Sequence, residues 1–249
     1  MVIICHGFIG NRIGVNRLFF KAAKKLSAAG YGVLRFDYQG CGESTGDYGD
    51  NTMPAFVQQT IRMIDYVVGL DFVDPNQIIL IGHSLGGATA SLTAAFDKRV
   101  KKLILWAAVG YPFEDITRIV GTEVYQNICK YGTTDYLGFE LKDTFFRGLR
   151  MLYPFEHCQQ YEHDVLILHG KQDEDIPMEY AYKYEQLYRK RAIHGLSGIG
   201  SADVRRYIIE RGDRTFSNSR SSEELYAQTL YWLQQTTSPN EQIYIMQTV

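Results

Sequence analysis

The chain has 249 residues, 45% of them hydrophobic and 22% charged, as expected for one globular domain or one domain with a sizeable insertion. Its net charge of −2 argues against a nucleic-acid partner, and no apolar run reaches the ~18 residues that a membrane span needs. The four cysteines show no metal-ligand spacing, so we expect reduced thiols, no metal site and a cytoplasmic location.

Short apolar runs alternate with stretches of helical spacing along the chain. The strand-like runs cover 2–5, 32–37, 77–81, 102–107, 164–168 and 206–210. The helical stretches cover 15–29, 53–70, 87–96, 179–191 and 222–235. The runs are continuously apolar, which is typical of parallel strands covered on both faces. The pattern predicts a doubly wound α/β fold with a mainly parallel sheet of about six strands.

One interval, 110–163, breaks this rhythm. It is rich in Tyr, Phe and Gly, shows no clean strand, and favours short helices near 116–130 and 141–152. We interpret it as a cap inserted into a core formed by 1–109 and 164–236. The long loop 192–203 and the tail 237–249 receive no assigned role.

The most informative motif follows the third strand-like run. Residues 82–87 read GHSLGG, between the apolar run QIILI and the small, helix-compatible run ATASL. This is G-x-S-x-G between a strand and a helix, where a serine on a sharp turn lifts its Oγ out of the sheet. The positions two residues away lie close to strand and helix, so only small residues fit there. We predict that Ser84 is a nucleophile.

Three further motifs lie in order around this one. Residues 5–8 read CHGF, residues 37–44 read DYQGCGES, and residues 169–177 read HGKQDEDIP. Together with G-x-S-x-G, they resemble the HG turn, the D-x-x-G-x-G-x-S loop and the acid loop of the α/β-hydrolase family. Within the interval 110–163, the stretches DYLGF (135–139) and YPFE (153–156) look most like bacterial carboxylesterases of the cinnamoyl or feruloyl type. The family usually has two strands before the HG strand, whereas this sequence begins inside that strand, and whether a longer natural protein supplies them is left open.

The resemblance implies acyl transfer without a metal or an organic cofactor. Ser84 would attack an ester carbonyl, backbone N–H groups of Phe8 and Leu85 would form the oxyanion hole, and Asp173 would orient a catalytic histidine. The substrate would be a small ester, possibly aromatic, and the oligomeric state is left open. The residues that support these motifs are His6, Gly7, Gly82, His83 and Gly86.

The chain departs from the family at the histidine itself. The loop after the last strand reads GDRTFSN over 212–218, so Arg214 stands where the resemblance implies histidine. A guanidinium cannot accept the serine proton, and we expect it to form a bidentate salt bridge with Asp173. We therefore expect an impaired ester hydrolase. A catalytically inactive binding protein, or a peptidase or thioesterase on the same scaffold, are the alternatives.

Overall fold

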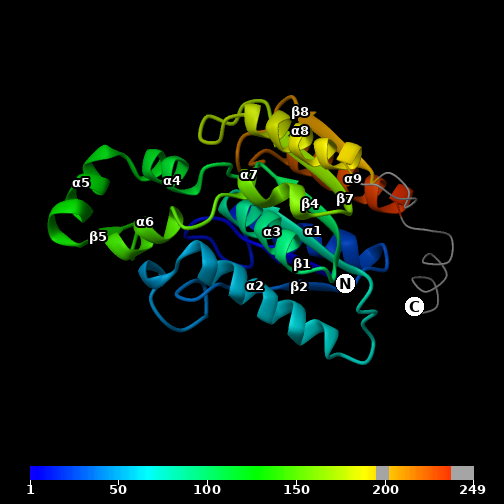
Figure 1. The fold of residues 1–249 in the computed structure, drawn as a ribbon, viewed down its shortest axis with the longest axis horizontal. Coiled ribbons are helices and arrows are strands. Elements are labelled where there is room, and N and C mark those ends of the chain that lie inside the picture. The colour runs from blue at the N-terminus through cyan, green and yellow to red at the C-terminus, as the bar shows by residue number, and fades with distance from the viewer. Residues whose placement is uncertain (195–201, 237–249) are drawn as a thin grey trace.

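Figure 1 shows the fold in a computed structural model, which describes residues 1–194 and 202–236. One parallel sheet has the strand order β2-β1-β3-β4-β7-β8. Its strands are β1 (Val2–Cys5), β2 (Val33–Arg35), β3 (Ile78–His83), β4 (Val100–Trp106), β7 (Asp164–Gly170) and β8 (Val204–Ile209). The predicted six-stranded parallel sheet is confirmed, and every strand overlaps the run that predicted it.

Helices cover both faces of the sheet, which explains why the central strands β1 and β3 are buried along their whole length. Strand residues alternate between two buried clusters, one on each face. One face packs against α1 (Leu18–Ala28) and α9 (Ser219–Thr236). The other packs against α2 (Met53–Val68), α3 (Leu85–Phe96) and α8 (Glu179–His194). The doubly wound arrangement is thus confirmed.

Helix α3 crosses the centre of the sheet and carries the residue after the candidate nucleophile at its first position. Its sequence, LGGATASLTAAF, consists largely of small residues, and all of them from Leu85 to Ala95 are buried. Small side chains let the helix axis approach the sheet closely. The start of α3 is therefore fixed against the ends of β1 and β3.

The interval between β4 and β7 projects from one end of the sheet, as Figure 1 shows. It contains α4 (Pro112–Val120), α5 (Thr122–Tyr131), β5 (Thr133–Tyr136), β6 (Phe139–Lys142), α6 (Asp143–Leu149) and α7 (Pro154–His157). We call this interval the cap. The prediction that it has no strand is wrong, because β5 and β6 form an antiparallel hairpin. Leu137 and Gly138, with φ of 54° and 84°, make its two-residue turn.

Short 3₁₀ turns complete the chain: η1 (Val15–Arg17), η2 (Tyr48–Asp50) and η3 (Cys158–Gln160). The helix predicted near 116–130 is divided at Gly121 into α4 and α5. The helix predicted near 141–152 is the shorter α6, because Leu141 and Lys142 belong to strand β6. Residues 195–201 of the long loop, and the whole tail 237–249, lie outside the described residues.

Candidate active site

The candidate nucleophile sits on a strained turn. Ser84, between β3 and α3, has φ 55° and ψ −121°, a conformation that residues other than glycine rarely adopt. Close packing on both sides holds this conformation. A Cβ on Gly86 would overlap the carbonyl oxygens of Cys5 and His6, and one on Gly82 would overlap the Gly86 carbonyl. Strain of this kind costs about 1–3 kcal/mol and is found where function requires it.

The turn after β1 lies directly beside this serine. A Cβ on Gly7 would be 3.0 Å from the Ser84 Cβ and 3.5 Å from its Oγ. His6 braces the turn: its Nε2 accepts the Tyr38 N–H at 3.1 Å, so its Nδ1–H donates to the Gly7 carbonyl at 2.9 Å. Burial lowers the pKa of His6 to about 4, which keeps the ring neutral. Both ring nitrogens are occupied, so this histidine cannot also serve Ser84.

The side chain of Phe8, the next residue, joins the turn to the cap. Its ring centroid lies 5.8 Å from Tyr48, 6.0 Å from Tyr136 and 5.9 Å from Phe145. Tyr136 belongs to the cap hairpin and Phe145 to α6. The cap therefore contributes an aromatic wall directly against the residue whose backbone N–H is the candidate oxyanion donor.

The acid loop holds one carboxylate oxygen firmly and leaves the other without a donor. Asp173 follows β7, its side chain is fully buried, and its Oδ1 accepts the N–H groups of Asp175 at 3.0 Å and Ile176 at 2.8 Å. Its Oδ2 is buried without a hydrogen bond. The Nε2 of His169 lies 3.3 Å from Oδ2, but 3.0 Å from the Ile176 carbonyl, to which it donates. An unsatisfied buried acceptor of this kind costs about 1–3 kcal/mol.

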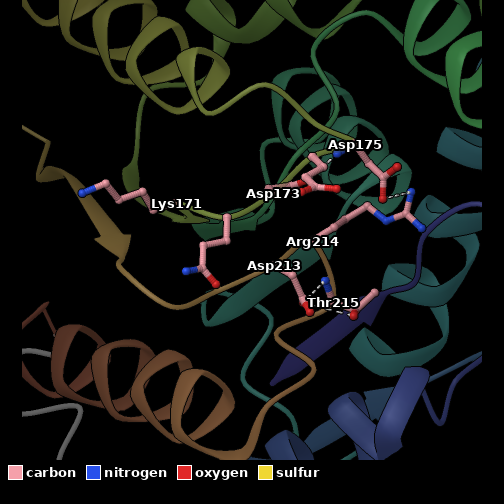
Figure 2. A pocket seen from close by; sticks show the side chains of 8 residues that line it. Lys171, Asp173, Asp175, Asp213, Arg214 and Thr215 are labelled. Atoms are coloured by element: carbon pink, nitrogen blue, oxygen red, sulfur yellow. Dashed lines mark hydrogen bonds and ion pairs between the residues drawn. The ribbon is translucent and has the colours of Figure 1, made fainter.

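Arg214 does not supply the missing donor. Its Nη1 lies 3.0 Å from Oδ2 of Asp175, and Figure 2 shows the guanidinium extended toward that residue. The expected salt bridge to Asp173 is therefore wrong. The reason is desolvation: Asp173 is fully buried, whereas the side chains of Arg214 and Asp175 are 29% and 47% exposed. A guanidinium loses less hydration at the more exposed partner.

The residue before the serine fixes the loop that carries Arg214. The Nε2–H of His83 donates to the Arg214 carbonyl at 2.7 Å, and its ring packs against Phe19 and Phe216. Burial lowers the pKa of His83 to about 4, so the ring is neutral. The sequence identifies His83 as part of the G-x-S-x-G motif but gives no sign of this bond, which joins residues 131 positions apart. The bond brings the backbone of position 214 next to the elbow.

The remaining histidines lie elsewhere. The Nε2 of His163 is 3.5 Å from the Lys101 Nζ, and His157 contacts Gln160 and Phe96, near the amino ends of β4 and β7. The side chain of His194 lies outside the described part of the structure. Among the histidine side chains that the structure describes, none is placed as a base for Ser84.

A surface hollow of about 730 Å³ opens beside this site. Residues 171–175 and 213–215 line it, so it lies between the acid loop and the loop after β8 (Figure 2). Ser84 is not among its lining residues. Within 1–194 and 202–236, no group of three or more His, Cys, Asp or Glu side chains could hold a metal ion. No helix in these ranges is long and apolar enough to cross a membrane.

Comparison with known proteins agrees with this fold. A family model described as the alpha/beta hydrolase fold matches residues 1–123. The structure of Est1E from Butyrivibrio proteoclasticus with bound ferulic acid superposes with a TM-score of 0.77 and 24% identity, covering 94% of this chain and 88% of that one. Six parallel strands with flanking helices and this superposition show the same fold.

Two curated relatives also match part of the chain. An uncharacterized 31.7 kDa protein of the traX-finO intergenic region of Escherichia coli is 36% identical over 104 residues, covering 42% of this chain and 35% of the relative. The lysophosphatidylserine lipase ABHD12 of Danio rerio is 26% identical over 200 residues, covering 78% of this chain and 49% of the relative. The chain thus spans about a third to a half of the length of these relatives.

Proposed function

Because this chain is a protein of the α/β-hydrolase fold, we propose that it is a serine-type hydrolase of carboxylic esters with Ser84 as its nucleophile. The observation that carries the proposal is the strained conformation of Ser84 beside Gly7. A serine held at this cost, with its Oγ next to the turn that precedes Phe8, suits attack on a carbonyl carbon.

The proposed reaction proceeds through an acyl-enzyme. Ser84 Oγ bonds to the ester carbonyl carbon, and the N–H groups of Phe8 and Leu85 stabilise the oxyanion. The carbonyl re-forms, the alcohol leaves with the serine proton, and water then hydrolyses the acyl-serine. A small aromatic acyl group is the proposed substrate class, and the ferulic acid bound to Est1E supports this choice.

Within the part of the chain that the structure describes, no side chain is found in position to take the serine proton. The guanidinium of Arg214 has only N–H donors and no acceptor for a proton, and it is turned toward Asp175. Removing the base of such a triad costs about 10⁶-fold in rate, with roughly 10³–10⁴-fold over water remaining from binding and the oxyanion hole. We therefore propose an intact esterase site that is impaired at one position.

The test compares hydrolysis of p-nitrophenyl acetate and butyrate by four proteins: the chain itself, Arg214→His, Ser84→Ala and the double variant. We expect little turnover by the chain and a rise of several orders of magnitude in Arg214→His that the second substitution abolishes. Equal, low rates in all four would overturn the proposal. Ser84-dependent turnover by the unmodified chain would show that another group acts as the base.

The second candidate is a ligand-binding protein without turnover. The ion pair between Arg214 and Asp175 favours it, because this pair occupies the loop where the base would lie. Calorimetric titration with ferulic acid separates the two candidates. Binding by the unmodified chain, together with an inactive Arg214→His variant, would favour the binding protein. Thioester and peptide substrates tested on Arg214→His distinguish an esterase from a thioesterase or a peptidase.

A further inference from the structure

Arg118, in the first cap helix α4, makes a connection between the cap and the acid loop. Its Nη2 donates to the Asp115 carboxylate at 2.8 Å and to the backbone carbonyl of Asp175 at 2.6 Å. Asp175 lies two residues after Asp173. One guanidinium nitrogen thus joins the cap to the loop that carries the candidate acid.

The cap end of this connection is rigid. Asp115 is fully buried, and it also accepts the Tyr111 N–H at 3.0 Å and the Tyr180 O–H at 3.0 Å. Tyr180 belongs to α8, the helix that follows the acid loop. A buried carboxylate with three donors is fixed in position, since losing any of them leaves charge unsatisfied in the core. Arg118 is therefore aimed at the loop by a side chain that cannot move freely.

The loop end of the connection involves a single peptide group. The carbonyl of Asp175, which accepts from Arg118, and the N–H of Ile176, which donates to Asp173 Oδ1 at 2.8 Å, belong to the same peptide unit. A hydrogen bond to a carbonyl polarises its amide and strengthens the N–H as a donor. A cation at the carbonyl also fixes the orientation of the peptide plane.

We propose that Arg118 is a positioning residue for Asp173, acting through the peptide between residues 175 and 176, so that the acid is held in place by the cap. The expected effect of Arg118 on catalysis rests on the proposed function. Its expected effect on the order of the acid loop does not. The cap thereby has a role in ordering the acid as well as in forming the aromatic wall.

Amide hydrogen exchange tests the structural consequence without any activity. We expect Arg118→Met to speed exchange of the Asp175 and Ile176 amides about tenfold, the effect of losing one charge-assisted hydrogen bond. Arg147→Met is the matched control, because Arg147 is a cap arginine whose salt bridge, 2.8 Å from Asp143, stays within α6. Unchanged protection of both amides in Arg118→Met would overturn the proposal.

Kinetics in the Arg214→His background tests the catalytic consequence. We expect Arg118→Met to lower kcat for p-nitrophenyl acetate about tenfold and KM less than about twofold, with partial recovery in Arg118→Lys. Faster exchange with an unchanged kcat would also overturn the proposal. If Arg214→His is itself inactive, the proposed function fails while the exchange experiment still decides the role of Arg118. If Arg118→Met does not fold, Asp115→Asn replaces it in the exchange experiment. We then expect faster exchange of the Asp175 and Ile176 amides, and unchanged exchange would refute the proposal.

Discussion

Two buried, neutral histidines make the fold sensitive to mild acid. His6 and His83 each have a pKa lowered by burial from the ordinary 6.5 to about 4. Below pH 6.5 the unfolded chain binds protons at these positions, whereas the folded chain does not until the pH approaches 4. Stability is therefore complete above pH 6.5 and is lost as the pH falls toward 4.

The magnitude follows from these two pKa values. Between pH 7.5 and pH 5.0, proton linkage removes about 2 kcal/mol of unfolding free energy for each histidine, or about 4 kcal/mol for both. Domains of this kind are stabilised by only about 5–15 kcal/mol in total. A loss of this size is thus measurable as a clear shift in the urea midpoint.

The assay is urea unfolding, followed by circular dichroism at the two pH values, for the chain and for His83→Gln. Glutamine can still donate to the Arg214 carbonyl but does not titrate, so the variant should lose about 2 kcal/mol less on acidification. His157→Gln, at a partly exposed position, is the matched control. An acid sensitivity unchanged by His83→Gln would refute the assignment of the effect to this ring.

Three further predictions concern the site. Gly86→Ala should destabilise the fold by about 1–3 kcal/mol in thermal unfolding, because the new methyl meets the backbone carbonyls of Cys5 and His6. A variant as stable as the parent would show that the elbow is less tightly packed than described. In the Arg214→His background, Asp173→Asn should lower kcat about 10⁴-fold, whereas Asp175→Asn should lower it only slightly. A larger loss in Asp175→Asn than in Asp173→Asn would identify Asp175 as the acid. In the chain itself, Asp175→Asn should change stability by less than about 1 kcal/mol, since its ion pair is partly exposed.

The sheet and the elbow could be predicted because each leaves a local signature. Parallel strands covered on both faces are continuously apolar, and the close approach of β1, β3 and α3 excludes side chains at Gly82 and Gly86. The cap hairpin was missed although Leu137-Gly138 stands at its turn. Leucine rarely adopts a positive φ, so the usual two-residue turn signal was incomplete there.

Side-chain partners were harder to predict than backbone placement. The sequence places Asp173 and Arg214 on neighbouring loops, and the structure agrees, yet the arginine pairs with Asp175. Burial decides this choice, and burial depends on how the loops fold over Asp173. The connection from Arg118 to the Asp175 carbonyl is likewise invisible in the sequence, because it joins residues 57 positions apart through a backbone atom.

The unsatisfied Oδ2 of Asp173 leads to an unusual final prediction: restoring the base should also stabilise the protein. Arg214→His gives up a partly exposed ion pair with Asp175, which is worth about 0–1 kcal/mol. The substitution adds an N–H donor for Oδ2 of Asp173, a buried oxygen that has no hydrogen bond in the present chain. The missing hydrogen bond costs the present fold about 1–3 kcal/mol.

Arg214→His should therefore unfold at a higher urea midpoint than the parent at pH 8, by roughly 1 kcal/mol in free energy. Asp173→Asn should abolish this gain in stability. The two substitutions, measured singly and together, therefore form a double-mutant cycle. If Arg214→His is active but less stable than the parent, the imidazole reaches Ser84 without satisfying Asp173. The acid must then come from another residue of the loop, and Asp175 is the first to test.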